Sequence, residues 1–145
     1  MREILFKAKQ IDNGEWIEGS LIDLDIDSGY CYIVQPYKKA SILPIIFLIT
    51  DRMKLVDPET LCQFTGLCDK NGKKIWENDI LMAHLDESYP EDATYETVEW
   101  GVAGFVTREA NSTDRQYLNE FDTKHFEVVG NIFDRPGLSQ EESDE

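Results

Sequence analysis

Short runs in which apolar and polar residues alternate predict most of the secondary structure of this chain. The run Ile4–Lys9 alternates as a half-buried strand does, and the Asn13-Gly14 pair that follows is typical of a type I′ hairpin turn. Residues 15–22 then form the returning strand. A second hairpin is expected around Asp27–Gly29, with Tyr30–Gln35 as its outgoing strand.

The same pattern continues beyond this pair of hairpins. Further strands are expected at residues 41–49, 74–76, 80–85, 95–100, 105–108, 125–129 and 131–133. The polar stretch 111–122 predicts a short helix or an ordered loop. About ten short strands with frequent turns, and no long amphipathic helix, predict an all-β or β-dominated fold with few short helical turns.

The segment Asp57-Pro58-Glu59-Thr60 predicts a boundary, because a Pro after Asp favours a turn or the start of one helical turn. We therefore expect an N-terminal β-hairpin module at residues 1–57 and a second module at residues 58–136. Residues 137–145 are acidic and nearly without apolar side chains, which predicts a disordered tail.

The two halves of the chain differ in net charge. The formal net charge is −15, and the residues after Ile80 carry four Lys or Arg against sixteen Asp or Glu. Such an acidic surface repels nucleic-acid phosphates, so direct binding to DNA or RNA is disfavoured. The alternative interpretation is that the charge only keeps the protein in solution.

Three cysteines, an odd number without regular spacing, do not predict a disulfide framework. Free thiols are typical of a reducing cytoplasm. The N-terminus has no apolar stretch of signal-peptide length. The most apolar run, Ile42–Ile49, is broken by Pro44 and is far shorter than the roughly 20 residues that span a membrane. We expect a cytoplasmic protein.

Three segments together resemble the YopX-like family of phage and prophage proteins. The central one is Thr65–Ile80, with a T-G-L start, a charged turn, an aromatic residue and an E-N-D step. The segments Met1–Ala8 and Val128–Phe133 resemble the first and last strands of the family. The resemblance implies a phage or prophage origin, a bacterial host cytoplasm and an SH3-like barrel in the second module. It implies no catalytic residue, because the family has no assigned biochemical activity.

The central segment also has a physical interpretation as a folding signature. Glycines 66, 72 and 130 suit backbone with positive φ or close approach, and Asp69 and Asn71 suit turns in which side chains bind backbone amides. Asn78 stands where the family usually has Gly, and Asn tolerates the left-handed conformation. The residues expected in the barrel interior are Ile75, Trp76, Ile80 and Ile132.

Two groups of residues suggest metals, and we assign neither as a site. Asp23–Gly29 resembles the start of a calcium loop, but Gly29 is at the seventh position and Val34, rather than Glu, is at the twelfth. An acidic hairpin tip is the alternative. Cys62, Cys68 and the histidines are not spaced as zinc ligands usually are. The histidines in question are His84, beside Asp86 and Glu87, and His125.

Catalytic motifs are missing from the sequence. The carboxylates of Glu77 and Asp79 are expected to bind backbone amides in a turn, rather than to work as an acid and base pair. No phosphate loop, dinucleotide fingerprint or nucleophile motif is present. We therefore predict a non-enzymatic protein with no catalytic, cofactor-binding or metal residue. A metal-dependent hydrolase using His84 is kept as a distant alternative.

Trp16, Trp76 and Trp100 are interpreted as packing residues, since a stacking platform for nucleic acid needs interleaved basic side chains. Lys70, Lys73 and Lys74 are the basic residues that cluster near one of them.

Our leading hypothesis is an accessory protein that binds a host or phage protein, or that self-assembles, through an edge strand or through the run Ile42–Ile49. A variant of it is nucleic-acid mimicry by the acidic half. The runner-up is nucleic-acid binding by a small barrel through Lys70, Lys73 and Lys74.

Overall fold

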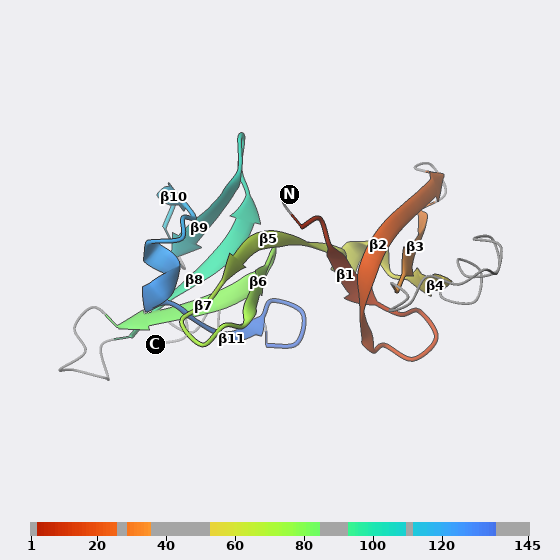
Figure 1. Cartoon of the computed structure of the whole chain (residues 1–145), viewed down its shortest axis with the longest axis horizontal. Coiled ribbons are helices and arrows are strands. Elements are labelled where there is room, and N and C mark those ends of the chain that lie inside the picture. Colours follow the sequence, from red (N-terminus) through yellow and green to blue (C-terminus); the bar gives the residue numbers. More distant parts are fainter. Residues whose placement is uncertain (1–2, 26–28, 36–52, 85–92, 110–111, 136–145) are drawn as a thin grey trace. The chain divides into compact units, whose positions relative to one another are not determined.

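The chain divides into two compact units, Met1–Gln63 and Phe64–Glu145 (Figure 1). The computed structural model describes residues 3–25, 29–35, 53–84, 93–109 and 112–135. Almost all of these residues lie in antiparallel strands or in the turns that join them, so the expected all-β class is confirmed. The expected strand at Ser41–Ile49 and the expected tail at 137–145 lie outside the described residues.

The first unit is a sheet whose strands follow the order β4-β3-β2-β1-β5. Its elements are β1 (Phe6–Lys9), β2 (Trp16–Asp25), β3 (Tyr30–Val34), β4 (Met53–Val56), the 3-10 turn η1 (Pro58–Thr60) and the start of β5 (Cys62–Cys68). Asp57 caps η1, because its side chain accepts a hydrogen bond from the N–H of Glu59 at 3.0 Å. Of the two alternatives predicted at this segment, a turn or the start of one helical turn, the structure has the helical turn.

Apolar side chains from one face of these strands form the core of the first unit. The buried members are Ala8, Ile17, Cys31, Ile33 and Val56. Gly19 lies in the same sheet where β2 approaches β3 closely. A Cβ atom at Gly19 would lie 2.1 Å from the carbonyl oxygen of Val34, so only glycine fits there.

The first hairpin differs from its prediction. A hydrogen bond from the N–H of Gln10 to the carbonyl of Glu15 closes the loop between β1 and β2, and four residues, Ile11–Gly14, lie inside this closing pair. Only Gly14 has positive φ, whereas a type I′ turn would need positive φ at Asn13 as well. The Asn13 side chain instead accepts a hydrogen bond from the N–H of Glu15 at 2.8 Å.

The second unit is a five-stranded sheet of order β10-β9-β8-β7-β11 (Figure 1). Its strands are β7 (Asp79–His84), β8 (Ala93–Trp100), β9 (Phe105–Glu109), β10 (Arg115–Tyr117) and β11 (Glu127–Asn131). The remaining elements are β6 (Lys74–Trp76), which pairs with β5, and the 3-10 turn η2 (Asp122–His125). Within the described residues β10 and β11 do not pair with each other, so the expected barrel is not closed by strand pairing.

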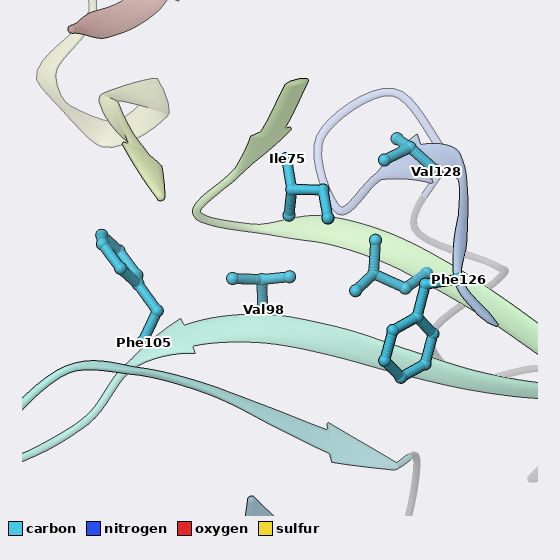
Figure 2. Close-up of a cluster of buried hydrophobic side chains, with 6 residues drawn as sticks. Ile75, Val98, Phe105, Phe126 and Val128 are labelled. Atoms are coloured by element: carbon cyan, nitrogen blue, oxygen red, sulfur yellow. The ribbon is translucent and has the colours of Figure 1, made fainter. Parts of the chain in front are cut away.

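The core of the second unit lies on one face of this sheet. The buried cluster consists of Ile75, Leu81, Val98, Phe105, Phe126 and Val128, and five of these residues are labelled in Figure 2. Trp76 is also buried and its ring packs on Phe64, with centroids 5.5 Å apart. Ile75, Trp76 and Ile80 are therefore interior residues, as predicted, whereas Ile132 is half-buried.

Two further predictions for the second unit need correction. The polar stretch 111–122 was expected to be helix or loop, but Arg115–Tyr117 forms β10 because its backbone pairs with β9. The two closing strands expected on either side of Gly130 are one strand, β11, with a register shift between Val128 and Gly130. Such a bulge bends a strand without ending it.

Candidate functional site

A polar pocket of about 260 Å³ lies on the second unit, over strands β8, β9 and β10. It is lined by Thr94, Glu96, Thr107, Glu109, Ser112, Asp114 and Gln116. Three of these residues are acidic and none is basic. The pocket is on the same face of the sheet as the apolar core, because Thr107 lies opposite Val98 on one side and opposite Gln116 on the other. Alternation along the strands thus directs these polar side chains to the core face.

Two of the acidic residues that line this pocket are cross-strand neighbours. Glu96 on β8 lies directly opposite Glu109 on β9, a cross-strand position where like charges are destabilising. Burial raises the pKa of Glu96, and the charges of Glu109 and Asp122 raise it further, whereas a hydrogen bond from the Thr107 side chain opposes this change. The residues that line the pocket therefore include three carboxylates and no basic side chain that could compensate their negative charge.

On the opposite face of the same sheet, two arginines pair with one glutamate. Nε and Nη2 of Arg108 lie 3.0 and 2.8 Å from Oε1 of Glu99, and Nε of Arg115 lies 3.5 Å from Oε2. The hydrogen bond with Glu99 raises the pKa of Arg108. Arg108 and Arg115 thus pair with Glu99, on the face of the sheet away from the pocket.

Strand β10 borders the pocket and is an edge strand of the sheet. All three of its residues are exposed, and β9 is its only strand partner within the described residues. The N–H of Leu118 donates to the carbonyl of Phe105 at 2.9 Å. Since backbone groups alternate in direction along an antiparallel strand, the N–H and C=O of Tyr117 are directed away from β9.

Large apolar side chains are exposed where β8 turns into β9. The turn is closed by a 2.7 Å hydrogen bond from the N–H of Gly101 to the carbonyl of Gly104. Trp100 is 56% exposed although its ring packs edge-on against Phe105, and Val102 is fully exposed. Tyr117 is 58% exposed, and a Cβ atom at Gly104 would lie 3.7 Å from its ring. One end of the sheet is thus apolar and exposed.

The tryptophans were all predicted to be packing residues, and the structure separates them. Trp76 is buried, which confirms the prediction for that residue, whereas the prediction is wrong for the exposed Trp100. Trp16 is half-buried, and the Nζ atoms of Lys7 and Lys9 lie 4.7 and 5.4 Å from its ring centroid. Sequence reasoning missed this basic and aromatic group, although the lysines alternate on β1 beside the strand that carries Trp16.

The three lysines of the central turn differ in their exposure to solvent. Lys70 and Lys73 are exposed, and Nζ of Lys74 lies 5.9 Å from the ring centroid of Phe64.

Asp79 of the family signature binds a backbone amide in the turn that precedes β7. Oδ2 of Asp79 accepts a hydrogen bond from the N–H of Trp76 at 2.8 Å, as predicted for this turn. Asn78 has φ 72°, the conformation for which Asn replaces Gly at low cost. Gly66 and Gly72 have positive φ, and a Cβ atom at Gly130 would lie 2.9 Å from the Arg135 side chain.

The residues that the sequence raised as possible metal ligands, and that we did not assign as a site, are not gathered where the structure describes them. Cys62 is buried with its Sγ atom 3.2 Å from the carbonyl of Thr60, and Cys68 is exposed. Across the described parts of the chain, no three His, Cys, Asp or Glu side chains are placed to hold one ion. Part of the acidic tip Asp23–Gly29, together with Asp86 and Glu87, lies outside those parts.

The two sheets and the short 3-10 turns define an all-β protein, built here from two compact units. The chain belongs to the YopX protein family, whose model matches residues 5–140. The family resemblance inferred from the three sequence segments is thereby confirmed.

The crystal structure of protein EF1440 from Enterococcus faecalis is similar to this chain, with a TM-score of 0.61 and 21% sequence identity. The similarity covers 95% of this chain and 99% of that chain, and at this identity it shows the fold alone. No curated protein matches the chain. Within the described residues, no helix has the length and apolar character needed to cross a membrane.

Proposed function

We propose that this protein is a non-enzymatic binding module that recognises another protein through strand β10 and the apolar end of its sheet. The observation that carries the proposal is the exposed edge of β10, where Tyr117 directs backbone groups away from β9. An unpaired strand edge is a template on which an extended segment of another chain adds by main-chain hydrogen bonds.

The apolar residues beside this edge support the same function. Trp100, Val102 and Tyr117 are large and exposed: Trp100 ends β8, Val102 lies in the turn to β9, and Tyr117 lies on β10, the strand that follows β9 in the sheet. Aromatic side chains supply much of the binding energy of protein interfaces, because each buries a large area with little loss of rotamer freedom. The edge would thus provide backbone pairing and the apolar end would provide area.

The test compares two substitutions at Tyr117. Tyr117→Ala removes the ring but keeps the backbone N–H, whereas Tyr117→Pro removes both and leaves the ladder with β9 intact. Tagged wild type and both variants are used for affinity purification from nuclease-treated bacterial lysate, and circular dichroism verifies that each variant is folded. We expect a protein partner that is retained in part by Tyr117→Ala and lost from Tyr117→Pro.

Two results would overturn this proposal. One is a wild-type protein that stays monomeric and retains no nuclease-resistant protein. The other is a partner that Tyr117→Pro and Tyr117→Ala retain as well as the wild type does, since binding would then not use the β10 edge.

A second candidate function, nucleic-acid binding, is supported by the lysines around Trp16. Surfaces that bind single strands combine aromatic rings with cationic side chains, and Lys7 and Lys9 lie within 5.4 Å of the Trp16 ring centroid. Lys70 and Lys73 offer a second, exposed basic position in the other unit. The net charge of −15 opposes this function.

Fluorescence anisotropy with a labelled single-stranded oligonucleotide at low salt tests the second candidate. The charge-reversed variants are Lys7→Glu with Lys9→Glu, and Lys70→Glu with Lys73→Glu and Lys74→Glu. The exposed Lys54→Glu is the matched control. Salt-sensitive binding that one set abolishes and the control preserves would promote this function, and no binding at low salt would remove it.

A further inference from the structure

We infer that the polar pocket beside β10 accepts a lysine or arginine side chain from an extended segment of the partner that pairs with this strand. The inference rests on the proposed binding function and adds the chemistry of the partner to it. It combines two features that meet at Gln116, which belongs to β10 and also lines the pocket.

Strand geometry brings the partner's side chain to the pocket. Gln116 and Thr107 form a hydrogen-bonded pair, so the N–H and C=O of Gln116 are directed toward β9. If a partner strand adds antiparallel to β10 on its other side, Gln116 and the partner residue opposite it therefore form a non-hydrogen-bonded pair. Residues in such a pair have Cα atoms about 4.5 Å apart and side chains on the same face. The partner residue opposite Gln116 would therefore direct its side chain over the pocket face.

The charges in the pocket select the type of side chain. Glu96, Glu109 and Asp114 line it without a basic neighbour among the lining residues. Glu96 and Glu109 are direct cross-strand partners, so a cation between them would relieve a like-charge contact as well as form a new pair. Thr107 and Gln116 supply polar groups around the same space. Arg or Lys has the length and donors to use these acceptors.

Other occupants fit this pocket less well. The chain's own C-terminal residues include Glu141, Glu142, Asp144 and Glu145, so that segment would add negative charge to a negative pocket. Two copies pairing edge to edge through β10 would bring two acidic pockets together. A basic segment of a different protein is the occupant that charge complementarity favours.

The experiment selects peptides from a random library of segments of about ten residues, the length of a single added strand. The folded full-length protein is immobilised, and selection is repeated with Tyr117→Pro and with the triple variant Glu96→Gln, Glu109→Gln and Asp114→Asn. Synthetic copies of the enriched peptides are then measured by fluorescence anisotropy. Glu127→Gln is the matched control, because Glu127 lies opposite Met82, on the face of the sheet away from Leu81 and the pocket.

We expect enriched peptides with one fixed Lys or Arg among residues of high strand propensity. The triple variant should raise the Kd of such a peptide about tenfold or more, as losing a charge-assisted hydrogen bond does, and Glu127→Gln should leave it unchanged. Replacing the fixed basic residue in the peptide by norleucine should have a similar effect.

The other outcomes separate this inference from the function on which it rests. Peptides that need the Tyr117 N–H but carry no fixed basic residue would overturn the inference and leave the edge-binding function standing. Basic peptides that bind the triple variant as tightly as the wild type would show attraction to the net charge alone and would also overturn it. Failure to enrich any peptide, together with no protein partner, would overturn both.

Discussion

The carboxylate of Asp69 accepts a hydrogen bond from the backbone N–H of Val128 at 2.9 Å, although the two residues are separated by 59 positions in the chain. The other carboxylate oxygen of Asp69 accepts from the N–H groups of Asn71 and Lys73, at 2.8 and 2.9 Å. Asp69 is 7% exposed. One buried side chain therefore holds the turn of the family signature and joins it to the closing strand.

Replacing Asp69 by Ala should be strongly destabilising, because three backbone donors lose their acceptor in a buried place. We expect the free energy of unfolding to fall by about 3 kcal/mol. Urea denaturation followed by circular dichroism measures this loss. The exposed Asp12→Ala is the matched control and should change stability by less than about 0.5 kcal/mol. Equal effects of the two substitutions would contradict the assigned role of Asp69.

Asn78 tests the cost of left-handed backbone in the same signature. Its φ is 72°, and its N–H and C=O bond to Val98 and Ile132, so the turn cannot relax freely. Asn78→Ala should cost about 1 kcal/mol, because a Cβ is disfavoured in this conformation. Asn78→Gly should be nearly neutral. Thermal denaturation gives both values, and an alanine variant as stable as the glycine variant would argue against a strained position.

Glu96 should make the stability of the protein depend on pH. Its pKa is raised from 4.5 by burial and by Glu109 and Asp122, against the opposing hydrogen bond from Thr107, and Asp114 lines the same pocket. The folded protein thus binds a proton more readily at this carboxyl than the unfolded chain does. Wild-type stability should therefore decrease as pH rises from below 4.5 through the higher pKa of the folded state.

The amide variant isolates this effect. Glu96→Gln cannot ionise, so at neutral pH it should be more stable than the wild type by up to about 1 kcal/mol, and the difference should vanish in acid. Urea denaturation across the pH range measures it. A Glu96→Gln variant that is less stable than the wild type at neutral pH would show that the like-charge contact with Glu109 is already compensated.

The three cysteines should react at very different rates. Cys68 is exposed, whereas Cys31 and Cys62 are buried. Burial raises the pKa of Cys31, and the charges of Asp23 and Asp57 raise it further, so its reactive thiolate is scarce near neutral pH. A disulfide reagent should label one thiol quickly and the others only after unfolding. Cys68→Ser should abolish the fast phase, and a fast phase of more than one thiol would contradict the burial.

Local features of the fold were predictable because they depend on neighbouring residues. Alternation identified β8, and the turn ending at Asp79 followed from residues next to one another in sequence. The predictions failed where pairing overrides local preference. Arg115–Tyr117 has no strand pattern of its own and is extended because β9 supplies its hydrogen bonds. The hairpin at Gly14 has the expected glycine in a longer loop.

The candidate site could not be predicted from the sequence, for the same reason. Glu96 and Glu109 lie on different strands, and nothing local predicts that the register places one carboxylate opposite the other. Trp76 and Trp100 are the same residue type, yet one is buried and the other is exposed, because only Trp100 lies at the open end of a sheet.

The sequence by itself determined the all-β class, the family and the positions of most turns, since strand alternation and turn residues act over a few positions. Only the tertiary structure decided which strands are edges, which carboxylates share a pocket and which side chains face solvent. These depend on the order and register in which distant strands pair, and that pairing is set by contacts among residues far apart in the chain.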